Sequence, residues 1–240
     1  MNSHSAYRIF PLGDASLTID FGNVINEELN KKVLGLFYFL QKNPFQGMIE
    51  AVPAYSSLTV YYDVLALKKK ATGENTVYDW AKKQVEEIVQ KTSTSEAVTG
   101  RLVEVPVCYE ASFAPGINDL AFLKNLSIEE IIRIHTAKQY RVYMLGFLPG
   151  FAYMGEVDEA ISMPRKQQPE NVVAGSVGIA GIQTGIYPLA SPGGWCIIGR
   201  TPLKLFDAAG DGEALLKAGD TVQFISITKD EFEGYQSRHS

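Results

Sequence analysis

One stretch of the chain gathers the glycine, proline, polar and aromatic residues that could line a small-molecule site. It runs from Gly181 to Leu203 and reads GIQTGIYPLASPGGWCIIGRTPL. Glycine lets a backbone approach a ligand closely, and binding side chains gather where strands end. Polar side chains of this stretch, next to the large aromatic Trp195, include those of Gln183, Thr184, Tyr187 and Arg200. The same composition is also typical of barrel corners, where turns need glycine and proline.

A histidine and a second arginine are further candidates for chemistry. His135 falls on the apolar face of a predicted helix and could act as a general acid–base, the alternative being a hydrogen-bonded core residue. Arg165 stands in Pro164-Arg165-Lys166. Arg165 or Arg200 could hold a carboxylate or phosphate through paired hydrogen bonds, the alternative being a surface arginine.

Other motifs exclude several kinds of site. Cys108 and Cys196 have no metal-ligand spacing, so we predict buried free thiols and no metal site. The segment 175–181 is rich in glycine, but its spacing is wrong and no Gly-Lys-Ser/Thr follows, so it is not a phosphate-binding loop. The segment 146–155, GFLPGFAYMG, predicts either an aromatic wall beside a ligand or a barrel corner filled by aromatic side chains.

Two domains are expected to position these residues. Alternating or periodic apolar residues predict a helix capped by Asn26, a helix over residues 77–91, and strands over residues 7–12, 16–21, 47–52 and 57–62. This pattern favours two helices laid on an antiparallel sheet. The segment Lys91–Glu96 has linker composition. We therefore place an N-terminal α+β domain at residues 1–95 and a second domain at residues 96–240.

The second domain is predicted to be a β-barrel. Ser127 and Glu130 form a capping box that opens a helix. Beyond residue 146 the chain is rich in glycine, and short extended runs recur at residues 177–180, 195–198, 203–206 and 221–227. Short strands bounded by turn residues indicate a closed or nearly closed barrel. The fold class is therefore α+β, a small N-terminal α+β sandwich followed by a β-barrel domain.

Composition and charge describe a globular protein. The chain has 240 residues, 46% hydrophobic residues and a formal net charge of -5, so affinity for nucleic acid is not expected. The longest strongly apolar run, from Val33 to Leu40, is too short to span a bilayer, and the N-terminus has no signal-peptide core. We therefore expect a cytoplasmic protein without a membrane partner.

The order of several motifs resembles the family of 5-oxoprolinase B subunits, which is also called the Kip-type kinase inhibitor or allophanate hydrolase subunit 1 family. The motifs are YRVYMLGFLPGF from Tyr140, AGSVGIAG from Ala174, QTGIYP from Gln183, SPGGW from Ser191 and IGRTP from Ile198. The resemblance covers nearly the whole chain. Two positions depart from the family pattern, which usually has proline where Ala152 stands and a second Pro-Arg where Pro169-Glu170 stands.

The resemblance implies that the second domain is a cyclophilin-like barrel, related to carboxyltransferase domains. It also implies that the chain is one component of a lactam hydrolase that opens 5-oxo-L-proline to L-glutamate. The chain would be inactive alone. The other components would be the 5-oxoprolinase C subunit, its direct partner, and the A subunit. ATP would be used by the complex and would not need to bind this chain alone. The alternatives are an inhibitor that blocks the autophosphorylation of a sensor histidine kinase, and one component of an allophanate-type amidase.

In the lactam hydrolase, each candidate residue has an expected role. His135, Arg165 and Arg200 are the catalytic candidates: His135 as acid–base, and the arginines as cations for carboxylate and phosphate. The backbone N–H groups of Gly193 and Gly194 would stabilise an oxyanion. The other substrate-binding residues would be Gln183, Thr184, Tyr187 and Trp195, of which the first three orient the ring amide.

Overall fold

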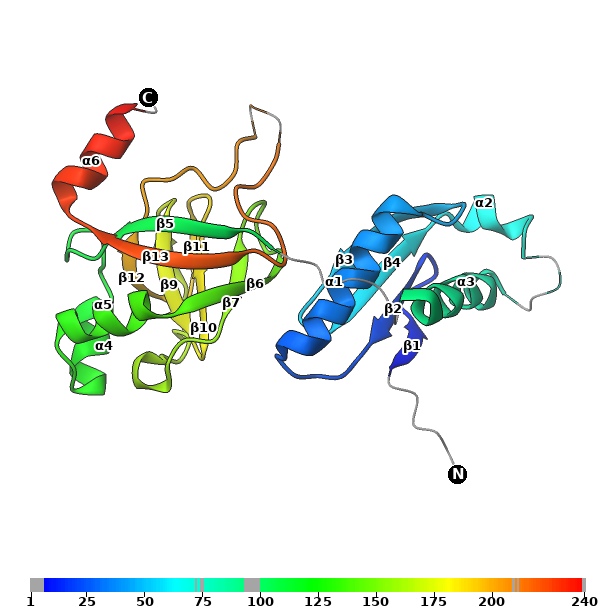
Figure 1. Ribbon diagram of the computed structural model, residues 1–240, viewed down its shortest axis with the longest axis horizontal. Helices are drawn as coiled ribbons and strands as arrows, with labels where there is room; N and C mark the ends of the chain where they lie inside the picture. Colours follow the sequence, from blue (N-terminus) through cyan, green and yellow to red (C-terminus); the bar gives the residue numbers. More distant parts are fainter. Residues whose placement is uncertain are drawn as a thin grey trace. The chain divides into compact units, whose positions relative to one another are not determined.

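The computed structural model describes residues 7–71, 73, 76–92, 100–208, 210 and 212–238. The chain divides into two compact units, Met1–Val98 and Thr99–Ser240 (Figure 1). Each unit has its own hydrophobic core. The domain boundary predicted between residues 95 and 96 lies outside the described residues.

The first unit is a four-stranded antiparallel sheet with helices, in the strand order β1-β2-β4-β3. Its elements are β1 (Arg8–Pro11), β2 (Ser16–Asp20), α1 (Glu27–Lys42), β3 (Met48–Pro53), β4 (Ser57–Tyr62), α2 (Val64–Lys68) and α3 (Val77–Thr92). The predicted cap is confirmed, because the Asn26 side chain accepts a hydrogen bond from the Leu29 amide at 3.0 Å. Helix α2, capped by Asp63, was not predicted, because its five residues are too short to show a helical period.

Strand alternation builds the core of this unit. Leu17 and Ile19 of β2 and Leu58 and Val60 of β4 are fully buried. The buried residues of α1 and α3 that join them in one cluster are Val33, Leu36, Leu40, Ala81, Val85 and Ile88. The apolar faces of the strands and of the helices therefore pack together and form the α+β sandwich that was predicted.

The second unit contains a closed barrel with the strand order β10-β7-β6-β13-β5-β12-β9. Its elements are β5 (Leu102–Cys108), α4 (Ile117–Lys124), α5 (Ile128–Ala137), β6 (Gln139–Leu145), β7 (Ala152–Gly155), η1 (Glu159–Ile161), β8 (Glu170–Val172), β9 (Ser176–Ala180), β10 (Gln183–Ile186), β11 (Ser191–Gly193), β12 (Cys196–Arg200), β13 (Thr221–Ile227) and α6 (Lys229–Arg238). Strands β8 and β11 form a separate two-stranded sheet. The predicted barrel and the capping box at Ser127 are confirmed.

One predicted strand of the barrel is wrong. Residues 203–206 form no strand; only Phe206 makes an isolated bridge, with Ala214. Leu203 and Leu205 instead pack against the barrel core from an irregular segment. Leu203 and Leu205 are apolar because they anchor this segment to the core. A short apolar run of this kind does not distinguish a strand from a buried loop.

The barrel wall separates two apolar clusters. The interior cluster includes Val177 and Ile179 of β9 and Ile186 of β10. A smaller cluster contains Phe151, Val172, Tyr187, Trp195 and Ile197. Since successive strand residues point to opposite faces, Ile197 and Tyr187 lie outside the wall whose interior holds Ile198 and Ile186. The second cluster therefore covers the outer surface of the barrel.

No helix within the described ranges has both the length and the apolar character needed to cross a bilayer.

Candidate functional site

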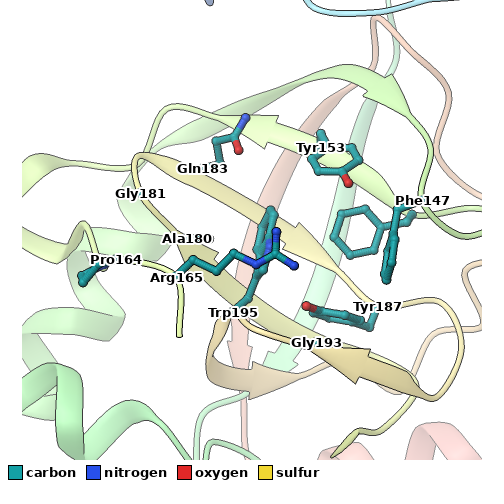
Figure 2. Close-up of a pocket in the computed structure, with 11 residues that line it drawn as sticks. Phe147, Tyr153, Pro164, Arg165, Ala180, Gly181, Gln183, Tyr187, Gly193 and Trp195 are labelled. Atoms are coloured by element: carbon teal, nitrogen blue, oxygen red, sulfur yellow. The ribbon is translucent and has the colours of Figure 1, made fainter. Parts of the chain in front are cut away.

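A pocket of about 400 Å³ lies at the outer cluster (Figure 2). It is lined by Phe147, Phe151, Tyr153, Pro164, Arg165, Ala180, Gly181, Gln183, Tyr187, Gly193 and Trp195. Strand alternation selects these residues: Gln183 and Tyr187 are an even number of positions apart along β10 and its end, and so share the outer face. The aromatic rings come from the loop before β7, from β7 itself, from the residue after β10 and from the residue before β12.

Glycine makes room for these rings at three positions. A Cβ on Gly185 would lie 3.0 Å from the Trp195 ring, and one on Gly178 would lie 3.1 Å from the Trp195 Cβ. A Cβ on Gly193 would lie 2.4 Å from the Tyr187 hydroxyl oxygen. Larger residues at these positions would push the rings away from the barrel wall. Glycine at these three positions therefore allows the rings to approach the backbone closely.

The floor of the pocket is an aromatic cluster centred on Phe151. Its ring packs edge to face with Tyr187, at 5.1 Å between centroids, and with Trp195, at 5.4 Å. The Tyr153 ring lies 4.7 Å from Phe151. Edge-to-face packing at these distances is the favoured arrangement of aromatic rings. The floor is therefore a rigid apolar surface.

Polar groups converge above this floor. Figure 2 shows the Arg165 guanidinium and the hydroxyls of Tyr153 and Tyr187 pointing toward the same space, with Gln183 at its edge. Burial raises the pKa of both tyrosines, although the charge of Arg165 opposes this in each case. The phenols are therefore protonated near neutral pH and can donate hydrogen bonds. A cation and two neutral donors suit a small carboxylate.

The loop that carries Arg165 is held at both ends. Met163 and Gly181 exchange two backbone hydrogen bonds, and the Lys166 amide donates to the Gly194 carbonyl at 2.7 Å. A Cβ on Gly194 would lie 3.0 Å from the Arg165 Nε, so the Arg165 side chain lies close against Gly194. The structure thus brings together five predicted residues, Arg165, Gln183, Tyr187, Gly193 and Trp195, in the pocket lining, and Gly194 lies next to one of them, Arg165.

His135 and Thr184 do not belong to this pocket. Both are fully buried inside the barrel, where the His135 Nε2 lies 3.2 Å from the Thr184 hydroxyl and the His135 Nδ1 lies 2.8 Å from the Tyr109 hydroxyl. His135 also stacks on Phe224 at 4.5 Å. Burial lowers the pKa of His135 to about 3. This geometry is that of a hydrogen-bonded core histidine, the alternative considered above. Thr184 faces His135 because adjacent strand residues point to opposite faces, and its neighbour Gln183 faces the pocket.

Arg200 is also placed away from the pocket. Its Nε donates a hydrogen bond to the Ala174 carbonyl at 2.8 Å, and its guanidinium lies over the Phe232 ring at 5.8 Å. These contacts join the end of β12 to the segment before β9 and to α6. Arg200 therefore stabilises the fold, and Arg165 is the arginine that lines the site.

The residues that depart from the expected family pattern also have clear positions. Ala152 begins β7 and pairs with Leu145 and Ile186. Glu170 pairs with Lys166, at 2.7 Å between Nζ and Oε2, on a solvent-exposed surface. The negative charge that replaces the expected arginine is therefore balanced by a neighbouring lysine.

Three aromatic residues of the pocket were absent from the predicted set, although their segment was considered as an aromatic wall. They are Phe147, Phe151 and Tyr153. The available signal was the alternation of Phe151 and Tyr153 with Ala152 and Met154, which are both buried in the barrel interior. The part of the chain with assigned positions contains no cluster of three or more histidine, cysteine or acidic side chains that could hold a metal ion.

Comparisons with known proteins agree with this architecture. A family described as the carboxyltransferase domain, subdomains C and D, matches residues 7–216. The B subunit of 5-oxoprolinase from Bacillus subtilis (strain 168) is 43% identical over 232 residues, which cover 96% of this chain and 97% of that protein. The protein of the same name from Escherichia coli O157:H7 is 34% identical over 221 residues, covering 91% and 95%.

A solved structure shows a similar fold. The crystal structure of TTHA0988 matches with a TM-score of 0.75 and 34% identity, covering 88% of this chain. This chain spans only 39% of that longer chain. The extent and identity of these matches show that the chain belongs to the carboxyltransferase subdomain C and D family and, within it, to the 5-oxoprolinase B subunits.

Proposed function

We propose that this chain is the B subunit of an ATP-dependent 5-oxoprolinase and that its outer pocket holds 5-oxo-L-proline. The observation that carries the proposal is the convergence of Arg165 and two phenol hydroxyls over an aromatic floor. 5-Oxoproline presents one carboxylate, one lactam amide and the apolar edge of a small ring. Each of these groups has a chemical counterpart in the pocket.

The carboxylate would bind the Arg165 guanidinium, which can form paired charge-assisted hydrogen bonds. Tyr153 and Tyr187 would donate to the remaining carboxylate or lactam oxygen, and the Gln183 amide can both donate to and accept from the lactam. The ring would lie on Phe151 and Trp195, where its apolar atoms leave water.

The composition of the pocket supports a role within a larger complex. An unstrained lactam resists hydrolysis, and phosphorylation of its carbonyl oxygen by ATP would activate it for attack by water. Every residue that lines the pocket is apolar, a phenol, an amide or arginine, so the lining offers no carboxylate or imidazole as a general base. The base and the phosphate-binding loop would come from the A and C subunits. This chain would orient the substrate and be inactive alone.

The test is a reconstitution with matched variants. The A and C subunits are purified with and without this chain, and ATP-dependent release of L-glutamate from 5-oxo-L-proline is measured. Arg165→Gln should lower kcat/KM roughly 10- to 100-fold, mainly through KM, because it removes a charged partner of the carboxylate. Lys166→Gln is the control, since Lys166 pairs with the exposed Glu170 and does not line the pocket.

Full activity of an assembly that lacks this chain would overturn its role in the complex. Equal effects of Arg165→Gln and Lys166→Gln would overturn the placement of the substrate. The same preparation assayed with allophanate tests the amidase alternative, and autophosphorylation of a sensor histidine kinase in its presence tests the inhibitor alternative, which stays a prediction.

A further inference from the structure

Phe147 has a strained backbone at the edge of the pocket. Its φ is 69°, a left-handed value that bulky residues rarely adopt. The Leu148 amide donates to the Gly146 carbonyl at 2.9 Å, so Phe147 is the central residue of a three-residue γ-turn. With a positive φ, this is the rare and strained form of that turn.

The surrounding chain imposes this conformation. The Gly146 amide donates to the Phe151 carbonyl at 3.1 Å, and the Phe151 amide donates to the Leu148 carbonyl at 3.0 Å. Gly150, with a φ of 81°, packs so tightly that a Cβ there would lie 2.8 Å from the Phe206 Cβ. The loop from Gly146 to Phe151 is therefore closed on itself. Strained residues persist where neighbouring contacts over-determine them, and they cluster at functional sites.

Burial of the Phe147 ring does not offset this strain. The residue is 60% exposed, so its ring contributes little to the core. The ring packs edge to face with Phe151, at 5.6 Å between centroids and 90° between planes. Figure 2 shows the ring at the side of the pocket across from Arg165. Glycine would adopt this φ freely, yet the chain places phenylalanine here between glycines at 146 and 150.

We propose that Phe147 is a specificity-determining residue, whose strained turn holds its ring against the apolar edge of the bound lactam. The inference rests on the proposed function, because it takes the carboxylate to be held by Arg165 on the opposite side. A cyclic substrate offers Phe147 an apolar ring edge. L-Glutamate, the ring-opened product, offers an ammonium and a second carboxylate in its place. Phe147 therefore favours the lactam over the open-chain product.

The test separates the ring from the strain. Phe147→Ala removes the ring and keeps the left-handed strain, whereas Phe147→Gly removes both. Phe122→Ala is the control, because Phe122 is 86% exposed on α4 and does not line the pocket. Each variant is measured twice, by thermal melting of the chain alone and by steady-state kinetics in the complex with the A and C subunits.

In melting, Phe147→Gly should be more stable than Phe147→Ala by about 2 °C, because only glycine is free of the left-handed penalty. At ordinary backbone positions the order is the reverse. In kinetics, both variants should raise the KM for 5-oxo-L-proline by roughly 3- to 10-fold with little change in kcat, the value of one aromatic contact. Inhibition by added L-glutamate should become relatively stronger. Phe122→Ala should match the wild type in KM and in inhibition.

The outcomes distinguish this inference from the function on which it rests. A wild-type complex that releases no glutamate overturns the proposed function and the role of Phe147 with it. A wild-type complex that is active, with unchanged KM in both Phe147 variants, overturns only the role of Phe147. A Phe147→Ala variant more stable than Phe147→Gly shows that the turn is not strained and overturns the structural argument.

Discussion

His135 is held in one protonation state by its two neighbours. The Thr184 hydroxyl donates to the Gly178 carbonyl at 3.1 Å, so its oxygen is left to accept the Nε2–H of His135. Nδ1 is then unprotonated and accepts from the Tyr109 hydroxyl at 2.8 Å. Both nitrogens of a neutral imidazole are thus satisfied. Protonation would add a second N–H facing a group that already donates.

This arrangement predicts how stability depends on pH. Burial lowers the pKa of His135 to about 3, whereas an unfolded histidine titrates near 6.5. Below pH 6.5 the unfolded state therefore binds a proton that the folded state does not, so the free energy of unfolding falls as the pH is lowered. This group alone should remove about 2 kcal/mol between pH 7.5 and pH 5.0. Urea unfolding at both pH values measures the loss, which should shrink in His135→Gln. The same loss in both proteins would contradict the prediction.

At the scale of elements, the barrel closes through a parallel pair. β5 and β13 run parallel over seven residue pairs, from Leu102 with Thr221 to Cys108 with Ile227. Their starts approach so closely that a Cβ on Gly100 would lie 1.8 Å from the Gly219 carbonyl oxygen. Asp220 ties them together: its buried carboxylate accepts from the Arg101 guanidinium at 2.7 Å and from the Arg101 and Lys217 amides.

Asp220 should therefore be a stabilising clamp of the barrel. Burial raises its pKa, but the hydrogen bonds from Arg101 and Lys217 outweigh this, and the net pKa is lowered. Asp220 therefore stabilises the fold at pH values above the unfolded pKa, near 3.8, and this stabilisation is lost as the pH falls below that pKa. Asp220→Asn should cost about 2–3 kcal/mol at pH 7, because donors that faced an anion then face an amide.

The matched control for Asp220 is Glu213→Gln. Glu213 pairs with Lys217 at 3.0 Å, but both side chains are largely exposed. Such surface pairs contribute little, so this change should cost less than about 0.5 kcal/mol. Equal costs for the two variants in urea unfolding at pH 7 would show that Asp220 is not a clamp.

At the scale of the whole molecule, the two units have separate cores and one tryptophan each. Trp80 packs against the core of the first unit, and Trp195 belongs to the outer cluster of the second. Trp80→Phe and Trp195→Phe therefore each leave a single fluorescent reporter. A chain with two cores need not unfold in one step.

Core truncations should consequently move one reporter at a time. Leu58→Ala leaves a cavity in the first unit and should lower the stability seen by Trp80 by about 2–5 kcal/mol. Ile198→Ala should do the same for the transition seen by Trp195. Urea titrations of the single-tryptophan proteins measure both. A shift of both reporters by either truncation would show that the units unfold as one.

Much of this architecture could be predicted from the sequence, because its causes are local. The Asn26 cap, the capping box at Ser127 and the alternating strands depend on residues a few positions apart. Local spacing also contained a signal that our site prediction did not use. Gln183 and Thr184 are adjacent in a strand, so they had to face opposite sides of the barrel wall.

The sequence alone thus determined most of the elements, the barrel and the family, whereas only the tertiary structure decided which side chains share the pocket. His135, Arg165 and Arg200 looked equivalent as candidates, yet only Arg165 reaches the site. The reason is physical: the pocket residues come from β7, β9, β10, β11 and the segments beside them, which only the folded barrel brings together. Register across the wall then sets which face each residue occupies, and residue type alone does not encode that register.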